Sequence, residues 1–326
     1  MLIDLDIMHT ERLFYIDICK FIAVFIVTWS HCAQRLSGMI WTNFLGGTQL
    51  DIAFSMPLFM MMSGWFINLE KMRSARFYDY MFQKFKRLIV PSFAWYVVHQ
   101  ILLFNSLDLS ILTYYWYLNA LFLCLCIIMI CSKNTENTLI CSLVSNAIVL
   151  VLPYSDFSHI NFMMPFLWAG YGFRRLCKLK YAPCIIIVCL IIGLFLCLFW
   201  NHQYTVYYSP FNILYLDRKM FLIMVYRLII GFMLSAVIIY SMSKVEKTWI
   251  NGLKNYGVFS LVIYTFSLVF LDSISVVFNH LHVHINRSGI IDVLSLFLCV
   301  FVVLVSILIG KYCSKYKLLS SLFLGE

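Results

Sequence analysis

Three side chains that can carry charge lie in the first apolar segment of the chain, YIDICKFIAVFIVTWSHC: Asp17, Lys20 and His31. On an α-helix, Lys20 and His31 are close to three whole turns apart and Asp17 lies one turn before Lys20, so all three project from one face. Such groups cost about 2.5 to 3.5 kcal/mol in the middle of a membrane helix, and three on one face predict a site. His31 is suited to be a general base, because imidazole titrates near neutral pH and takes a proton from a hydroxyl. Asp17 can pair with Lys20, which reduces the cost of burying either.

A second group of cations stands in QKFKRLIVP, residues 83–91. Lys84 and Arg87 are three positions apart, so on a helix they share a face and can bind phosphates together. Lys86 is better explained as an ordinary cation at the cytoplasmic end of a membrane helix.

Three more residues are candidates for supporting roles. Arg227 lies within the apolar run MVYRLIIGF and has no carboxylate one turn away, so we expect it to face a water-filled cavity or to pair across helices, for example with Asp17. Trp116 and Asn119 begin a helix in YWYLNALF, where Trp is common at a membrane interface and the Asn amide can hydrogen-bond an acceptor.

We predict no metal site. HLHVH, residues 280–284, could place imidazoles on one side of a strand, but no acidic or Cys partner stands nearby, and a polar loop is the favoured interpretation. The twelve cysteines include no CxxC pair, and many lie in apolar segments, where they act as small buried hydrophobes.

The elements that position these residues are membrane helices. Of the 326 residues 63% are hydrophobic and 12% charged, a balance that predicts an all-α polytopic integral membrane protein. Apolar runs long enough to cross the hydrocarbon core predict about ten transmembrane helices. Their approximate ranges are 14–33, 49–68, 87–105, 114–132, 138–153, 160–173, 183–200, 220–242, 256–277 and 289–310. The fifth and sixth are short and contain or adjoin Pro153 and Pro165, which we expect to break them.

The positions of the cations predict the orientation. Most Lys and Arg residues fall in segments on the side of the N-terminus, so both termini, including the tails 1–10 and 312–326, are expected to be cytoplasmic. This topology explains the net charge of +9 without a nucleic-acid partner. No linker or internal repeat divides the chain, which predicts a single integral membrane domain over residues 1–326.

Five stretches of the chain resemble the membrane acyltransferase 3 family of bacterial O-acyltransferases. They are YIDICKFIAVFIVTWSH (15–31), SMPLFMMMSGWF (55–66), KFKRLIVPSFAWY (84–96), YWYLNALF (115–122) and, more weakly, YGVFSLVIYTFS (256–267). The resemblance implies a multi-pass enzyme of the bacterial cytoplasmic (inner) membrane that is surrounded by lipid. It leaves open whether the enzyme forms a homo-oligomer. It implies transfer of an acyl group, usually acetyl from acetyl-CoA, to a hydroxyl of a surface polysaccharide or its lipid-linked precursor.

The resemblance also assigns roles to single residues. The family's basic residue and catalytic His in the first helix fall on Lys20 and His31, and its paired basic residues before the third helix fall on Lys84 and Arg87. Lys stands at 20 and 84 where Arg is frequent, and Lys keeps the charge but loses the planar fork that grips phosphate.

Two positions depart from the family pattern. Ser55 and Ser267 stand where many members have His, so the chemistry rests on His31 alone. We expect the cytoplasmic cations Lys84 and Arg87 to bind the phosphates of acetyl-CoA, with its pantetheine arm directed toward Lys20 and the acceptor approaching from outside.

Two other classes of protein remain as alternatives. A transporter or flippase for a glycan or lipid-linked sugar would also need many helices and intramembrane charges. A sensor or scaffold without chemistry is the third option. Nothing in the sequence identifies the acceptor sugar or the length of the acyl chain.

Overall fold

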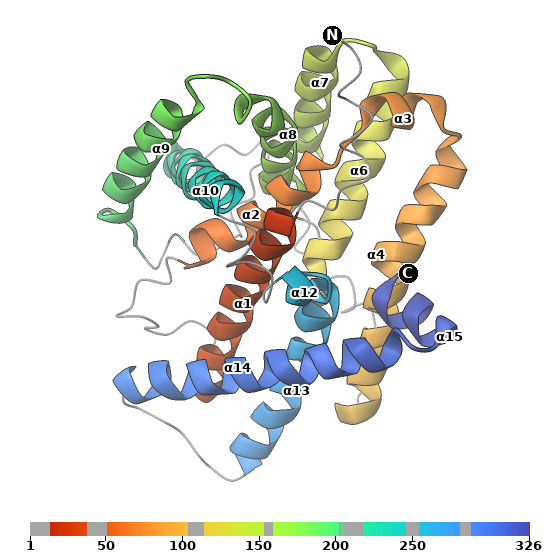
Figure 1. Ribbon diagram of the computed structural model, residues 1–326, viewed down its shortest axis with the longest axis vertical. Helices are drawn as coiled ribbons and strands as arrows, with labels where there is room; N and C mark the ends of the chain where they lie inside the picture. The colour runs from red at the N-terminus through yellow and green to blue at the C-terminus, as the bar shows by residue number, and fades with distance from the viewer. Residues whose placement is uncertain are drawn as a thin grey trace.

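The computed structural model describes residues 14–37, 51–103, 114–152, 159–201, 204, 218–245, 254–280 and 288–326. These residues form helices and no strands (Figure 1). The longer helices are α1 (Phe14–Leu36), α2 (Asp51–Trp65), α4 (Phe77–Leu103), α6 (Trp116–Asn134), α7 (Thr138–Val151), α8 (Ile160–Leu176), α9 (Ala182–Cys197), α10 (Arg218–Lys244), α13 (Ser260–His280) and α14 (Ser288–Cys313). The short ones are α3 (Leu69–Ser74), α12 (Lys254–Gly257), α15 (Lys317–Leu319) and the π-helix η4 (Ser320–Leu324).

Each of the ten predicted segments overlaps one of the longer helices, and the all-α prediction is confirmed for the described residues. The boundaries differ most at α4, which begins at Phe77, before the predicted start of the span at 87. The short helices were not predicted. For α3 the local signal is a cap, because the side chain of Asn68 accepts a hydrogen bond from the backbone N–H of Lys71 at 2.9 Å.

The two prolines that were expected to break helices act differently. The helix α7 ends at Val151, and Leu152 is extended (φ −61°, ψ 142°), as the residue before a proline prefers to be. The helix α8 instead continues through Pro165. Neighbouring helices can compensate for the missing N–H inside a packed bundle, so a proline does not by itself end such a helix.

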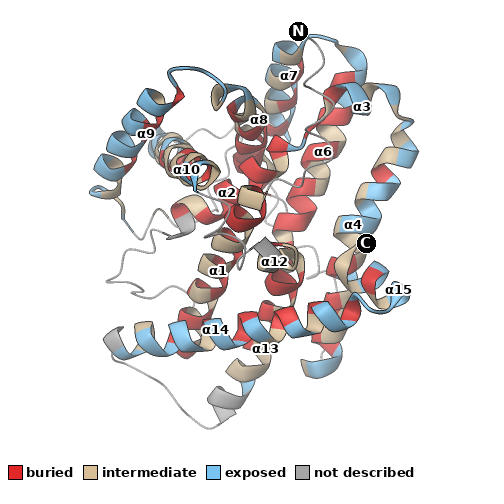
Figure 2. Ribbon diagram, in the orientation of Figure 1, coloured by how far each residue is buried: buried red, intermediate tan, exposed pale blue. Residues whose placement is uncertain are grey.

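Large apolar side chains cover much of the outer surface. Figure 2 shows exposed faces along α7, α9 and α14, and the exposed residues there include Leu143, Ile191, Phe195, Phe297 and Leu308. An apolar surface of this extent suits lipid rather than water.

Length and composition qualify four described helices as candidate membrane spans. They are Phe14–Leu36, Trp116–Asn134, Phe221–Lys244 and Ile290–Cys313. Together with the apolar exterior they are consistent with a membrane protein, and the count of ten spans stays a prediction.

The helix α1 lies at the centre of the bundle and packs against α2, α10, α12, α13 and α14 (Figure 1). On one side of it, α2 and α8 approach so closely that a Cβ on Gly64 would overlap the carbonyl of Leu167, and a Cβ on Gly170 that of Met61. Glycines permit this backbone contact, which is how membrane helices commonly pack.

The C-terminal residues fold back onto α4. The indole Nε1 of Trp95 donates to the carbonyl oxygen of Phe323 at 3.3 Å, and Gly325, with φ +71°, lies against the backbone of Arg87. A residue with a Cβ would be strained at that φ, which favours glycine there. We call the end of the bundle at which α1 begins the inner end, in line with the predicted orientation, and the opposite end the outer end.

Candidate functional site

Asp17 and Lys20 form an ion pair at the inner end of α1. Lys20 Nζ lies 3.7 Å from Asp17 Oδ1 and 5.3 Å from the centre of the Phe66 ring. The Lys20 side chain is 30% exposed, whereas that of Asp17 is 8% exposed. Gly257 packs directly on the carbonyl of Asp17, so α12 fixes the backbone of this turn.

His31 lies in the outer half of the same helix, about 16 Å from Lys20 along the axis at about 1.5 Å per residue. Its Nδ1 is 3.2 Å from Oε1 of Gln34, one turn further on. An amide oxygen only accepts hydrogen bonds, so this contact places the ring proton on Nδ1 and leaves the lone pair on Nε2. The imidazole is half-buried, and among the described residues no hydrogen bond involves Nε2, so this nitrogen can act as a base.

A group of four polar residues at the outer end was not predicted; we call Arg35, His99, Tyr114 and Asp272 the outer cluster. Arg35 Nη2 lies 2.5 Å from Asp272 Oδ1. The other oxygen, Oδ2, accepts from Tyr114 Oη at 2.5 Å and from His99 Nε2 at 3.0 Å. The carboxylate of Asp272, on α13, thus binds Arg35 of α1 and His99 of α4. It also binds Tyr114, two positions before the start of α6.

The outer cluster lies next to His31. Arg35 is one turn beyond His31, on nearly the same face of α1. The imidazole of His31 also lies within the range of electrostatic interaction with Arg35 and Asp272. His31 is therefore adjacent to a partly buried ion pair whose acidic partner no motif in its own helix reveals.

The predicted phosphate-binding cations are on the inner half of α4. Lys84 is half-buried with Nζ 5.3 Å from the centre of the Tyr80 ring, and Arg87 is exposed. Burial, followed by the charges of Arg87 and Lys71, lowers the pKa of Lys84, which precedes the predicted span. Cations that repel one another at an accessible surface favour the binding of a polyanion.

Arg227 is deeply buried, with its guanidinium carbon 4.7 Å from the centre of the Phe162 ring near the start of α8. Tyr15, by contrast, contacts Trp65, which in turn contacts Phe173 near the end of α8. Arg227 and the first turn of α1 are therefore at depths about 16 Å apart at ~1.5 Å per residue. The suggested pairing of Arg227 with Asp17 was wrong, because Asp17 pairs with Lys20 at the other end of the bundle.

Trp116 and Asn119 lie at the start of α6. The ring of Trp116 meets that of His159 edge-on, with centroids 4.8 Å apart, and Asn119 is 8% exposed. His159 has a positive φ of 40° and directly precedes α8. Asn119 is therefore buried in the bundle, and Trp116 is half-buried against the residue that precedes α8.

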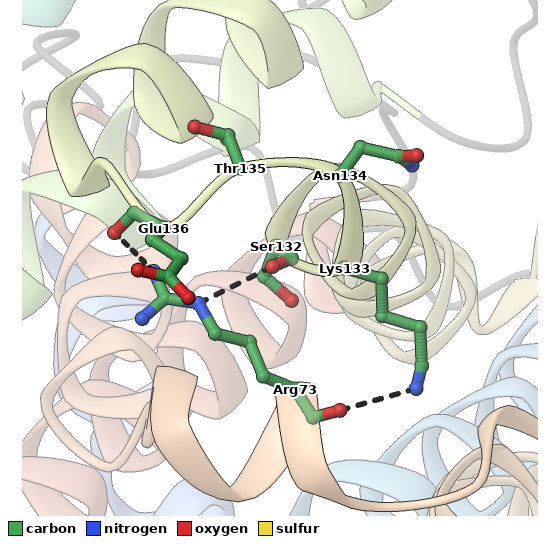
Figure 3. Close-up of a pocket in the computed structure, with 6 residues that line it drawn as sticks. All are labelled: Arg73, Ser132, Lys133, Asn134, Thr135 and Glu136. Atoms are coloured by element: carbon green, nitrogen blue, oxygen red, sulfur yellow. Dashed lines mark hydrogen bonds between the residues drawn. The ribbon is translucent and has the colours of Figure 1, made fainter.

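One described cavity, of about 200 Å³, lies at the inner end between α3 and the turn from α6 to α7. Figure 3 shows Arg73 reaching across it, where the guanidinium donates to the carbonyls of Ser132 and Glu136 at 3.2 and 2.7 Å. Lys133 donates to the carbonyls of Arg73 and Ala75. Both cations donate hydrogen bonds to backbone carbonyls at helix ends, so the residues around this cavity hold α3 against α6 and have a structural role.

Among the described residues, no group of three His, Cys, Asp or Glu side chains could hold a metal ion. Residues 281–284 of the HLHVH segment lie outside the described residues.

The structure keeps the predicted pair Asp17 and Lys20 together and places His31 on the same helix. It adds Arg35, His99, Tyr114 and Asp272, which sequence reasoning missed. A signal was present, because Asp272 is the one carboxylate in the apolar segment 260–280 and such a group marks a site.

Comparison with known proteins identifies a family. The family model of the acyltransferase 3 family, described as an acyltransferase domain, matches residues 13–311. No curated protein and no solved structure matches the chain. The matched range contains every residue of the candidate site and the outer cluster.

Proposed function

Because the chain belongs to the acyltransferase 3 family and is a membrane acyltransferase, we propose that it transfers an acetyl group from acetyl-CoA to a hydroxyl of a surface polysaccharide or its lipid-linked precursor. The proposal places the enzyme in the bacterial cytoplasmic membrane. The observation that carries it is the separation along α1, where the ion pair of Lys20 and Asp17 stands at the inner end and His31, with Nδ1 on Gln34 and the lone pair on Nε2, stands in the outer half.

The inner end supplies the groups that a nucleotide donor needs. Lys84 and Arg87 are accessible cations on one helix, and Lys84 is supported by the face of Tyr80. They would hold the phosphates of the donor, while Lys20, partly exposed beside Phe66, would meet a less charged part of it.

His31 supplies the base. Its Nε2 accepts the proton of a sugar hydroxyl as the oxygen attacks the thioester carbon, which forms the new C–O bond. The C–S bond then breaks, and the imidazolium returns the proton to the departing thiolate. Gln34 keeps the ring in the required tautomer throughout, since its oxygen accepts from Nδ1.

Radiolabelled acetyl-CoA tests this proposal in membranes from cells that make either the wild type or His31→Ala. We expect label in the surface glycan with the wild type and a fall to the background of cells without the protein for His31→Ala. The loss should be at least about a hundredfold, the lower range for a general base. Ser37→Ala, which removes a hydroxyl just beyond α1, serves as the matched control and should keep activity within about twofold.

The assay also tests the transporter alternative. Glycan export that continues without any label transfer in the wild type would favour a transporter, and full transfer by His31→Ala would exclude His31 as the base. Equal amounts of protein in the membrane, measured by immunoblot, are required for either conclusion.

A further inference from the structure

His99 carries a buried nitrogen without a partner. The residue is 6% exposed, and its Nε2 contacts Oδ2 of Asp272 at 3.0 Å. A carboxylate oxygen accepts, so Nε2 donates, and in the neutral imidazole Nδ1 then carries the lone pair. Within the described part of the chain, Nδ1 is shielded from solvent and has no hydrogen-bond partner.

An unpartnered buried acceptor is costly and rare. It loses its hydration without a replacement bond, at about 1 to 3 kcal/mol, and most buried polar groups in proteins avoid this. A hydrogen-bond donor that enters the bundle at this point would recover that loss. Nδ1 of His99 is therefore a position where a bound hydroxyl gains affinity.

Two aromatic rings pack around His99. The Tyr96 ring is stacked on the imidazole with centroids 6.4 Å apart, and the Tyr114 ring lies at 4.4 Å. Aromatic faces pack against the apolar C–H faces of a pyranose, while hydroxyls at its rim need polar partners. Since no solvent reaches Nδ1, a neighbouring ring must rotate to admit a hydroxyl.

The outer cluster connects this position to the proposed base. Asp272 binds His99 through one oxygen and Arg35 through the other, and Arg35 is one turn from His31 on α1. A sugar held at His99 would thus lie at the outer end of the bundle, on the side of α1 that carries His31. This is the end from which the acceptor is expected to approach.

We propose that His99 binds the acceptor, with Nδ1 accepting a hydrogen bond from a glycan hydroxyl and Asp272 acting as the positioning residue for the ring. This deepens the proposed function and rests on it for the identity of the ligand. It also gives the outer end a second histidine, although Ser55 and Ser267 replace the two that are frequent in the family.

Two substitutions separate this role from a purely structural one. The amide of Gln reaches the place of Nε2, so His99→Gln keeps a donor to Asp272 but offers no acceptor at Nδ1. The amide of Asn reaches the place of Nδ1, so His99→Asn keeps a polar group there but loses the contact with Asp272.

Binding without the donor gives the most direct test. The probe is the surface polysaccharide of the producing cell, deacetylated with mild base, and the protein is the full chain purified in detergent. We expect His99→Gln to raise the Kd about fivefold to a hundredfold, because the bound hydroxyl no longer satisfies a buried acceptor. The melting temperature and the binding of radiolabelled acetyl-CoA should both stay at their wild-type values.

Each outcome is decisive. A wild-type Kd for His99→Gln, or a wild type that does not bind the deacetylated polysaccharide, overturns the role of Nδ1. A lower melting temperature for His99→Asn with a Kd nearer to the wild type than that of His99→Gln supports it. If polysaccharide binding depends on His99 but the wild type transfers no label, the proposed acyl transfer is refuted. The acceptor-binding role of His99 is then still supported.

Discussion

The two ends of α1 hold their charged groups in opposite ways. At the inner end, Lys20 meets one carboxylate oxygen at 3.7 Å and the face of Phe66, and almost a third of its side chain is exposed. At the outer end, Asp272 is bound by three side chains from other parts of the chain, with contacts of 2.5 to 3.0 Å.

This difference between the two ends suits two kinds of ligand, a charged acyl donor at the inner end and a neutral hydroxyl at the outer end. Loosely held cations such as Lys84 and Arg87 can rearrange around a large, water-soluble polyanion, and the binding energy comes mainly from charge. A fixed carboxylate that orients an imidazole suits a neutral hydroxyl, which must be placed accurately before its proton is removed. The inner end is therefore adaptable, and the outer end is preorganised.

The largest effect is expected from Asp272→Ala. The substitution leaves Arg35, His99 and Tyr114 without their shared acceptor. Because the ion pair with Arg35 is only partly buried, we expect a loss of about 2 to 3 kcal/mol, mainly from His99 and Tyr114 left without a partner. Chemical denaturation in mixed micelles should show this loss of unfolding free energy. Glycan acetylation in the same membranes should fall to background.

Asp292→Ala provides the matched control on the neighbouring helix α14. Asp292 is half-buried near the same end of the bundle, and we expect its removal to cost clearly less than the removal of Asp272, which accepts from three side chains. If Asp272→Ala is as stable as Asp292→Ala, the outer end is not preorganised by this carboxylate and the contrast between the two ends fails.

An intermediate effect is expected from the double variant Lys84→Gln/Arg87→Gln. Loss of two charge-assisted bonds to phosphate should raise KM for acetyl-CoA roughly tenfold to a hundredfold, with kcat and unfolding free energy unchanged. Initial rates of label transfer at a series of donor concentrations give both constants.

Lys86→Gln is the control for this pair. Lys86 is exposed on the same helix, with Nζ 4.5 Å from the centre of the Phe82 ring. An equal rise in KM for Lys86→Gln would mean that the inner surface attracts the donor only through its overall charge, without a defined pair.

The same contrast explains what could be predicted from the sequence. The helices follow from the lengths of the apolar runs, and the pair of Asp17 and Lys20 follows from their spacing within one helix. Both are local properties. The contacts of Asp272 with His99 and Tyr114 join residues 173 and 158 positions apart, and no periodicity in one segment encodes such a partner.

Two errors have the same origin. The predicted first span ends before Arg35, which places this cation in an outer loop, whereas it lies in the last turn of α1 and binds Asp272. For Arg227, Asp17 was named as an example of a partner across helices, although the two residues lie at different depths. Depth within the bundle decides such pairings, and depth depends on how helices of different tilt pack.

The smallest effect is expected from Asp17→Asn at the inner end. Its ion pair with Lys20 is long and open to solvent on the lysine side, and pairs of this kind contribute about 0 to 1 kcal/mol. Asn keeps the size of the side chain, and Gly257 holds the backbone of this turn independently of its charge. We therefore expect the unfolding free energy to fall by less than about 1 kcal/mol and label transfer to stay within about threefold of the wild type. The same denaturation and transfer assays measure both. A loss of transfer as complete as that of Asp272→Ala would show that Asp17 takes part in the reaction, and that the inner end is as strictly organised as the outer one.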